Sequence, residues 1–280
     1  MADTPTQAAP KEARDPEVPS VSEVVQELAK IAVLKVQNYA KLSFRAVANF
    51  ATAPRYLDDT LQQMDDIGVG SLPIVLLSGF FIGAVMVLQT GAQFERFGQA
   101  SLTGDVVSLA LVRELGPTIT GLLVAGRCSS GIASELGSML VTEQVDAMRA
   151  MGTDPSRKLV TPRVLASLVT LPLLTTISVF VGLLGGMVAS VFSLRINAVT
   201  FWQRAIAILQ FSDIMQGFSK TMVFALILST VGCYQGLNVS GGTQGVGRAT
   251  TQAVVVSSVL IIVSDTFLTK LGLFLADRLF

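Results

Sequence analysis

The sequence contains no histidine and only two cysteines among its 280 residues. Without histidine, neither His-ligated zinc nor His-based acid/base catalysis fits the composition. Cys128 and Cys233 lie in or beside different apolar segments, which gives neither a disulfide framework nor the spacing of a metal site. We therefore expect neither a zinc site, nor a disulfide framework, nor His-based catalysis in this chain.

Charged residues are also scarce. Only 14% of the residues are charged and 51% are hydrophobic, unlike the composition of a soluble domain. Uncharged runs cover residues 67–94, 164–194 and 221–247. Each is longer than the roughly 20 residues that a helix needs to cross a bilayer. Because two further apolar segments, 104–126 and 251–276, carry only a few charges, the sequence predicts an all-α integral membrane protein with about five transmembrane helices.

The charges that are present are distributed unevenly. Twenty Lys and Arg balance twenty Asp and Glu, and no basic stripe with interleaved aromatic residues occurs, so nucleic acid is not an expected partner. Basic residues concentrate before the first span and between the second and third, and the positive-inside rule places both segments in the cytoplasm. We expect a cytoplasmic N-terminus. These residues are Lys11, Arg14, Lys30, Lys35, Lys41, Arg45 and Arg55, then Arg149, Arg157, Lys158 and Arg163.

The composition divides the chain into three regions. Residues 1–20 are polar and rich in proline, as in a disordered tail and unlike a cleavable signal. Residues 21–66 start with apolar positions at helical spacing, which favours an amphipathic helix on the inner membrane surface; a soluble helix packed on a partner is the alternative. Residues 67–280 form the five-span domain, in which Gly79–Gly83 and Gly182–Gly186 predict close helix packing.

The segment Gly242–Thr250 resembles a phosphate-binding loop. However, Arg248 replaces the required lysine, Ala249 replaces the magnesium-binding Ser or Thr, and no strand-loop-helix unit surrounds the segment. We interpret it as a flexible cytoplasmic turn between the fourth and fifth spans. If the protein uses ATP, a separate chain has to bind it.

Four ionisable residues in the predicted spans or at their start are candidates for a functional role. Arg113 and Glu114 are midway along the second span, before Gly116-Pro117, which can kink the helix. They form either a gate whose charges face protein or water, or a structural pair that fixes helix register by bonding to neighbouring spans, and the sequence favours neither. Lys220 and Asp265 have opposite signs and could pair across the fourth and fifth spans. A proton relay is the weaker interpretation.

The connection between the second and third spans predicts a short charged helix over residues 142–152. Thr142 can cap it, Gly152 can end it, and Asp154-Pro155 prevents its continuation. An exposed helix with methionines on the cytoplasmic face is typical of a docking element. The candidate docking residues are Glu143, Gln144, Asp146, Met148, Arg149, Gly152, Asp154 and Pro155.

Several motifs resemble the MlaE-like permease family, the MCE-associated transmembrane subunits of bacterial lipid ABC transporters. The resemblance runs from about residue 67 to the C-terminus, and the block 113–163 is its most specific part. The motifs are Arg113-Glu-Leu-Gly-Pro117, Ala125-Gly-Arg127, Ala133-Ser-Glu-Leu-Gly137, Thr142-Glu-Gln-Val-Asp146, Met151-Gly-Thr-Asp-Pro155, Pro162-Arg163, Lys220-Thr-Met-Val-Phe224 and Gly247-Arg-Ala-Thr-Thr251.

The resemblance implies a homodimer of five-span subunits in the bacterial inner membrane, with a hydrophobic cavity for lipid tails. The helix over 142–152 would be the coupling helix of a cytoplasmic ABC ATPase that binds ATP and Mg²⁺, and a periplasmic MCE-domain protein would continue the lipid path. We expect a permease subunit that moves phospholipid or a related lipid between inner and outer membranes, is not itself an enzyme, and binds no metal or cofactor. The first span, which is uncharged and contains glycine, is the candidate cavity wall through Phe80, Phe81, Val85 and Leu88.

Two other functional classes are open on the residues alone. One is a secondary transporter driven by protons through Glu114, Lys220 and Asp265, although the inverted repeats common in such transporters are not evident. The other is a membrane scaffold that anchors a periplasmic complex without transport. A co-purifying ATPase together with bound lipid would favour the permease over both alternatives.

Overall fold

A computed structural model describes residues 30, 34, 37–45, 48–49 and 56–279 of the chain. The tail expected at residues 1–20 and most of the interfacial region expected at 21–66 lie outside these residues. Residues 37–45 are helical. The contacts divide the chain into two units, Met1–Ala40 and Lys41–Phe280, and the larger unit holds the long apolar helices.

Five helical segments of the larger unit are long and apolar enough to cross a membrane, and no strand occurs in the part of the chain that the structure describes. Each segment exceeds the length that a bilayer requires, so the backbone polar groups can all be paired within helices. The predicted all-α membrane protein with five spans is confirmed. The segments are Leu57–Arg96, Ala100–Val141, Ser156–Leu194, Phe211–Leu237 and Gly242–Phe274.

The spans are built from several consecutive helices. The first consists of α2 (Leu57–Ile67) and α3 (Leu72–Arg96), and the second of α4 (Thr103–Ala110), α5 (Gly116–Val124) and α6 (Ser130–Val141). The π-helical turns Leu111–Leu115 and Ala125–Ser129 join the parts of the second span, and a third π-helical turn, Ser156–Val160, opens the third span. The remaining helices are α7 (Gln144–Ala150), α8 (Thr161–Leu194), α9 (Ala198–Ala207), α10 (Phe211–Leu237) and α11 (Gly242–Leu279).

Several expected boundaries are wrong. The second span continues to Val141, and α10 begins at Phe211, ahead of Lys220, the expected start of the fourth span. The flexible turn expected at 242–250 is helical, because α11 starts at Gly242. Gly245 is buried in that first part of α11, where a Cβ atom would lie 2.1 Å from the backbone oxygen of Ser240. This glycine therefore permits a close chain approach and does not mark a mobile loop.

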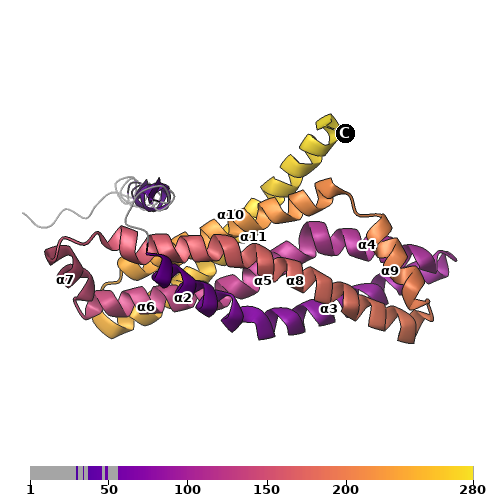
Figure 1. The fold of residues 1–280 in the computed structure, drawn as a ribbon, viewed down its shortest axis with the longest axis horizontal. Coiled ribbons are helices and arrows are strands. Elements are labelled where there is room, and N and C mark those ends of the chain that lie inside the picture. Colours follow the sequence, from indigo (N-terminus) through magenta and orange to yellow (C-terminus); the bar gives the residue numbers. More distant parts are fainter. Residues whose placement is uncertain (1–29, 31–33, 35–36, 46–47, 50–55, 280) are drawn as a thin grey trace, which may run out of the picture. The chain divides into compact units, whose positions relative to one another are not determined.

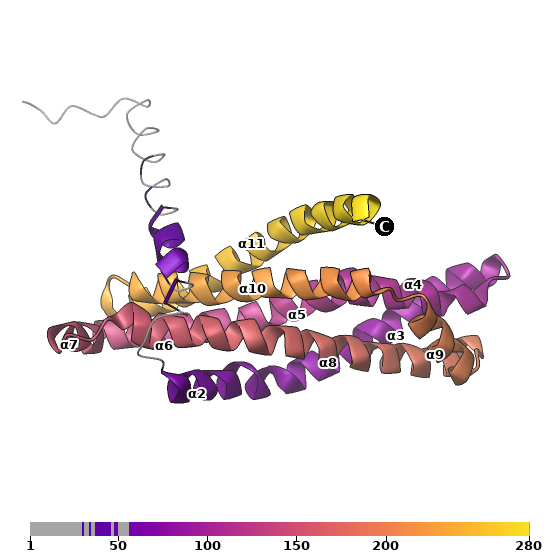
Figure 2. The same cartoon turned by 45° about the horizontal axis from the view of Figure 1, so that its top comes forward.

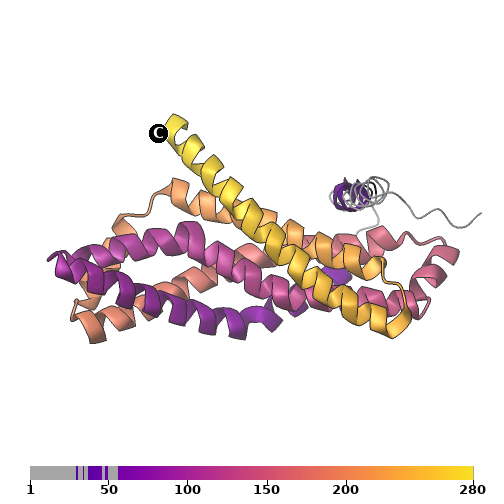
Figure 3. The ribbon, with the colours of Figure 1, turned by 180° about the vertical axis from the view of Figure 1, so that it is seen from behind.

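The helices of the larger unit pack side by side. Helix α8 packs against α3, and α10 packs against both α6 and α11 (Figures 1 and 2). Seen from behind, α11 crosses the second span, and its C-terminal part diverges from the other helices (Figure 3). Helix α7 lies at one end of the unit, whereas α9 packs on α4 at the opposite end (Figure 1). The short helices therefore mark the two ends of the spans.

The two predicted glycine motifs form the contact between α3 and α8. A Cβ atom on Gly83 would lie 1.8 Å from the backbone oxygen of Gly182, and one on Gly185 would lie 2.1 Å from the oxygen of Phe80. Only glycine allows the two backbones to come this close, and close backbone approach is the main source of van der Waals packing between membrane helices. The predicted helix packing is confirmed.

We expect Gly83→Ala to destabilise the protein, by about 1–3 kcal/mol for an overpacked contact, because the added methyl group must separate α3 from α8. Gly131 is the matched control, since it is also helical but has no heavy atom within 4 Å of a Cβ position. Gly131→Ala should be neutral or stabilising by up to about 1 kcal/mol. The thermal midpoint of the detergent-solubilised protein measures both, and equal midpoints would contradict the close α3–α8 contact.

Candidate functional site

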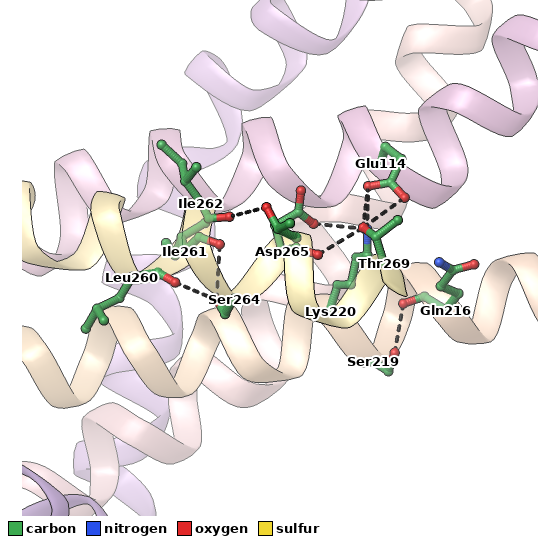
Figure 4. Close-up of polar contacts among 11 residues, drawn as sticks. Glu114, Gln216, Ser219, Lys220, Leu260, Ile261, Ile262, Ser264, Asp265 and Thr269 are labelled. Carbon is green, nitrogen blue, oxygen red and sulfur yellow. Dashed lines mark hydrogen bonds and ion pairs between the residues drawn. The ribbon is translucent and has the colours of Figure 1, made fainter. Parts of the chain in front are cut away.

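A buried ammonium group joins three spans. Lys220 of α10 is fully buried, and its Nζ forms ion pairs with Glu114 of the second span and, at 3.0 Å, with Asp265 of α11 (Figure 4). It also donates a hydrogen bond of 2.7 Å to the hydroxyl of Thr269. The Asp265 oxygen lies outside hydrogen-bond alignment, so its attraction for Lys220 is mainly coulombic. The pairing expected of Lys220 with Asp265 is present, with Glu114 as a second partner.

Thr269 completes this cluster. Its hydroxyl lies 2.9 Å from the backbone oxygen of Asp265 and 3.2 Å from each carboxylate oxygen of Glu114 (Figure 4). A hydroxyl both accepts and donates, so it can receive the Lys220 hydrogen bond and return its own proton to an oxygen of the cluster. Removing a charge from water is costly, and each added partner offsets part of that cost.

A second ion pair links the second span to the fourth span, α10. The Nε of Arg113 donates to Oδ1 of Asp213 at 2.7 Å, and Asp213 is only 1% exposed. The other oxygen of Asp213 accepts the backbone N–H of Gln210 at 2.9 Å, which caps the N-terminus of α10. Asp213 therefore accepts a hydrogen bond from an otherwise unpaired backbone N–H and neutralises an arginine whose side chain is 33% exposed.

The local backbone makes both pairs possible. Arg113 and Glu114 lie in the π-helical turn Leu111–Leu115, and their partners Asp213 and Lys220 are seven residues apart, so they lie on one face of α10. Between them, a Cβ atom on Gly217 would lie 2.4 Å from the backbone oxygen of Val112. Glycine at 217 thus allows α10 to approach the π-helical turn closely enough for its charges to reach their partners.

Adjacent charges on the second span bond to a neighbouring span and not to each other. This geometry matches the second of the two interpretations of Arg113 and Glu114, a structural pair that bonds to neighbouring spans. Sequence reasoning missed Asp213 and Thr269. Asp213 could have been found from its spacing of seven residues to Lys220, had α10 been expected to begin as early as Phe211.

The short helix between the second and third spans is α7. Its outer side is exposed and carries an ion pair of 2.8 Å between Asp146 and Arg149. Gly152 has a φ of +78°, which ends the helix as predicted. Asp154 accepts the backbone N–H of Ser156 at 2.9 Å, and the next π-helical turn starts immediately after Pro155. The candidate docking residues lie in or beside α7, and all of them except Met148 and Pro155 are exposed.

The predicted N-terminal cap of α7 is wrong. The Thr142 hydroxyl donates to the backbone oxygen of Ser138 at 2.8 Å and does not cap α7. Glu143 occupies the capping position with a φ of +59°, and the side chain of Gln144 donates to Thr142 at 3.0 Å. The α6 helix continues through Val141, so Thr142 bonds backwards to its last turn.

Helix α7 is attached to the spans by its inner side. Val145 is fully buried in a cluster with residues of α6, α8 and α10, and Met148 packs against that cluster. Displacing α7 would therefore expose apolar surface unless the cytoplasmic ends of the neighbouring helices moved with it. The buried members are Ile132, Leu136, Val145, Leu159, Val160, Val164 and Cys233.

The expected cavity residues lie on the outer side of α3. Phe81, Val85 and Leu88 are exposed, and Phe80 is half-buried with its ring packed edge-on against Phe81 at 5.6 Å. None of them lines the apolar pocket of about 250 Å³ between the second, third and fourth spans. That pocket includes Pro117, Pro172, Thr175, Phe180, Ile214 and Phe218. A cavity role for the α3 residues stays a prediction.

Arg127 ties the first span to the second. Its Nη1 donates to the backbone oxygen of Asp66 at 2.9 Å and to the hydroxyl of Ser71 at 3.0 Å. A Cβ atom on Gly70 would lie 2.4 Å from the guanidinium, so this glycine makes room for the side chain. Among the residues that the structure describes, no group of three His, Cys, Asp or Glu side chains is placed to hold a metal ion.

Comparison with known proteins identifies the class. The chain is 42% identical over 233 residues to the "Probable ABC transporter permease protein" of Rickettsia typhi, covering 83% of this chain and 90% of the relative. It is 35% identical over 212 residues to the "Intermembrane phospholipid transport system permease protein MlaE" of Haemophilus influenzae, covering 75% and 81%. A chloroplastic protein of Arabidopsis thaliana, "TRIGALACTOSYLDIACYLGLYCEROL 1", is 40% identical over 214 residues, covering 76% and 61%.

These similarities, together with the five apolar spans, define a multi-pass permease subunit of the ABC transporter class. The family model described as "Permease MlaE" matches residues 60–271. The chain belongs to the MlaE permease family, as the resemblance of its motifs predicts.

We expect Lys220→Met to be far more damaging than Asp265→Asn. Removing the ammonium strands two carboxylates, and a broken buried pair costs about 3–5 kcal/mol. Asp265→Asn leaves the neutral pair of Glu114 with Lys220. Thermal midpoints of the solubilised variants measure the difference. Lys270→Met is the control, because Lys270 is exposed on α11, the helix that carries Asp265. The pairing would be refuted if Lys220→Met and Lys270→Met had the same midpoint.

Proposed function

We propose that this chain is the membrane subunit of an ABC transporter that moves phospholipid or a related lipid between the inner and outer membranes of a bacterium. A separate cytoplasmic ATPase binds ATP and Mg²⁺ and drives the movement. The observation that carries the proposal is the exposed helix α7, set between two spans in a member of a permease family. The name of the Haemophilus influenzae relative supports the choice of phospholipid.

Helix α7 has the form that a coupling helix requires. Its exposed side offers charges to a partner, while Val145 and Met148 hold its inner side in the apolar cluster behind it. A force applied to the outer side would therefore reach the ends of the neighbouring spans. The basic residues around α7 support a cytoplasmic position for this end of the protein and for the N-terminus, with the spans in the inner membrane.

The outward faces of α3 and α11 support a homodimer with a lipid cavity. These two spans are the least buried, with 28% and 11% of their most apolar stretches covered by the rest of the chain. A second copy of the chain, with lipid tails between the copies, would cover Phe81, Val85 and Leu88 on α3 and the apolar face of α11. A periplasmic MCE-domain protein would receive lipid at the end of the spans that carries α9.

The intramembrane charges favour the permease over a proton-driven transporter. Arg113, Glu114, Lys220 and Asp265 each have an oppositely charged partner, which suits a structural role. A relay requires groups that can exchange protons in sequence along a path. In this arrangement the ion pairs hold the second, fourth and fifth spans in register while ATP hydrolysis on the partner supplies the energy.

The proposal is tested by purification and reconstitution. The tagged chain, expressed together with the genes that adjoin its own, should co-purify with an ATPase and an MCE-domain protein. It should also retain phospholipid, which mass spectrometry identifies. Reconstituted vesicles should exchange labelled phospholipid with acceptor vesicles only when ATP is hydrolysed. Lipid flux driven by a proton gradient without ATP would support the secondary transporter, and an ATPase-free, lipid-free complex would support the scaffold.

We expect Asp146→Lys and Gly152→Pro to release or uncouple the ATPase while the spans remain inserted. The first reverses a charge on the exposed side of α7, and the second places proline, whose φ is near −65°, where the backbone has a φ of +78°. The ratio of ATPase to tagged chain after purification is the readout. Glu95→Lys is the control, because Glu95 is exposed in the last turn of α3, at the other end of the spans. Unchanged ATPase association and transport in both α7 variants would remove α7 from the interface.

A further inference from the structure

An ion pair between a buried arginine and a half-exposed glutamate joins the helices that precede and follow α7 in the chain. The Nη2 atom of Arg163, near the start of α8, lies 2.7 Å from Oε1 of Glu135 in α6. Its Nη1 atom donates to the backbone oxygen of Leu159 at 2.6 Å. Arg163 is 4% exposed, whereas the side chain of Glu135 is 52% exposed. The guanidinium thus connects α6, which precedes α7 in the chain, with the π-helical turn and α8, which follow it.

The burial of Arg163 is unusual for a residue close to the end of a span. Arginine at such a place usually extends its charge to water or headgroups, since burial of the charge is costly. Leu159 and Val164, which precede and follow Arg163 in the chain, belong to the apolar cluster that contains Val145 of α7. The charge therefore sits beside the contact that attaches α7 to the spans.

One donor of this guanidinium is unsatisfied. The Nε of Arg163 is buried and has no hydrogen-bond acceptor. Arginine bonds a carboxylate most strongly through two parallel hydrogen bonds, and Nε with Nη2 is one edge that can make them. Nη2 already forms an ion pair with Glu135, whose side chain is half-exposed. A second arrangement is therefore available, in which Glu135 accepts hydrogen bonds from both Nε and Nη2.

We propose that Arg163 and Glu135 are positioning residues that make the cytoplasmic halves of the second and third spans move as one body with α7. The pair passes from an ion pair through Nη2 alone to two hydrogen bonds, through Nε and Nη2, when the partner ATPase displaces α7. The inference rests on the proposed function, because it needs an ATPase that acts on α7. Neither residue has to contact lipid or ATP for this role.

The test compares lipid transfer with ATP hydrolysis in the reconstituted complex. Glu135→Gln keeps the size of the side chain and removes its charge, and Arg163→Lys keeps the charge but removes the planar fork. We expect both variants to retain the ATPase and its rate of hydrolysis, while lipid transferred per ATP falls by about tenfold, the scale of a lost charged hydrogen bond. The exchanged pair Glu135→Arg with Arg163→Glu should recover part of the loss.

Arg204→Gln is the matched control. It removes another interhelical pair, in which Arg204 of α9 lies 3.5 Å from Asp105 of α4, far from α7 in the fold, and it should leave transfer per ATP unchanged. If Arg163→Lys does not fold, Glu135→Gln decides, because Glu135 is half-exposed. If hydrolysis and lipid transfer fall in proportion, or if neither falls, the inference is wrong and the proposed function still stands. Wild-type protein that recruits no ATPase would overturn the proposed function instead.

Discussion

The Lys220 ammonium is a charge with no access to water, and the arrangement of three spans depends on keeping it compensated. Glu114, Asp265 and Thr269 reach it from two different spans, so none of these helices can slide or rotate without leaving a charge unpaired. Hydrophobic contacts alone would not set this register, because lipid tails are as apolar as the leucines and valines of the helices. The second pair, Arg113 with Asp213, adds a constraint on the same face of α10, seven residues before Lys220.

The number and approximate place of the spans could be predicted from sequence, because a bilayer imposes a minimum length of apolar helix. Helix ends could not be predicted as well. The expectation that few charges lie inside spans moved the expected start of α10 to Lys220, past Asp213, yet both of these charges are neutralised by another span. Likewise, the glycines after Ser240 suggested a turn, although Gly245 is buried in the first part of α11.

The candidate site was predictable only in part, for a physical reason. Opposite signs on Lys220 and Asp265 were sufficient to suggest a pair, since neither charge is tolerable alone in hydrocarbon. Sequence could not show that Lys220 is shared with Glu114, nor that Arg113 turns to Asp213, because both depend on the π-helical turn at Leu111–Leu115. Such a turn has no reliable signature in composition. The inner attachment of α7 through Val145 is a tertiary property of the same kind.

The family indicates what class of transporter the chain belongs to, and the geometry of the chain indicates how its parts work. Family membership supplies the class of transporter. The geometry contributes a division of labour: ion pairs hold the spans in register, glycine faces bring α3 close to α8, and α7 is presented at one end on an apolar base.

The chain has a single tryptophan, and Trp202 of α9 stacks edge-on against Phe180 of α8 with ring centres 6.0 Å apart. The intrinsic fluorescence of the protein therefore originates almost entirely at this contact. A change in the emission spectrum during turnover would report whether α9 separates from the third span, with no label introduced. The native chain thus has an optical probe at the end of the membrane helices opposite α7.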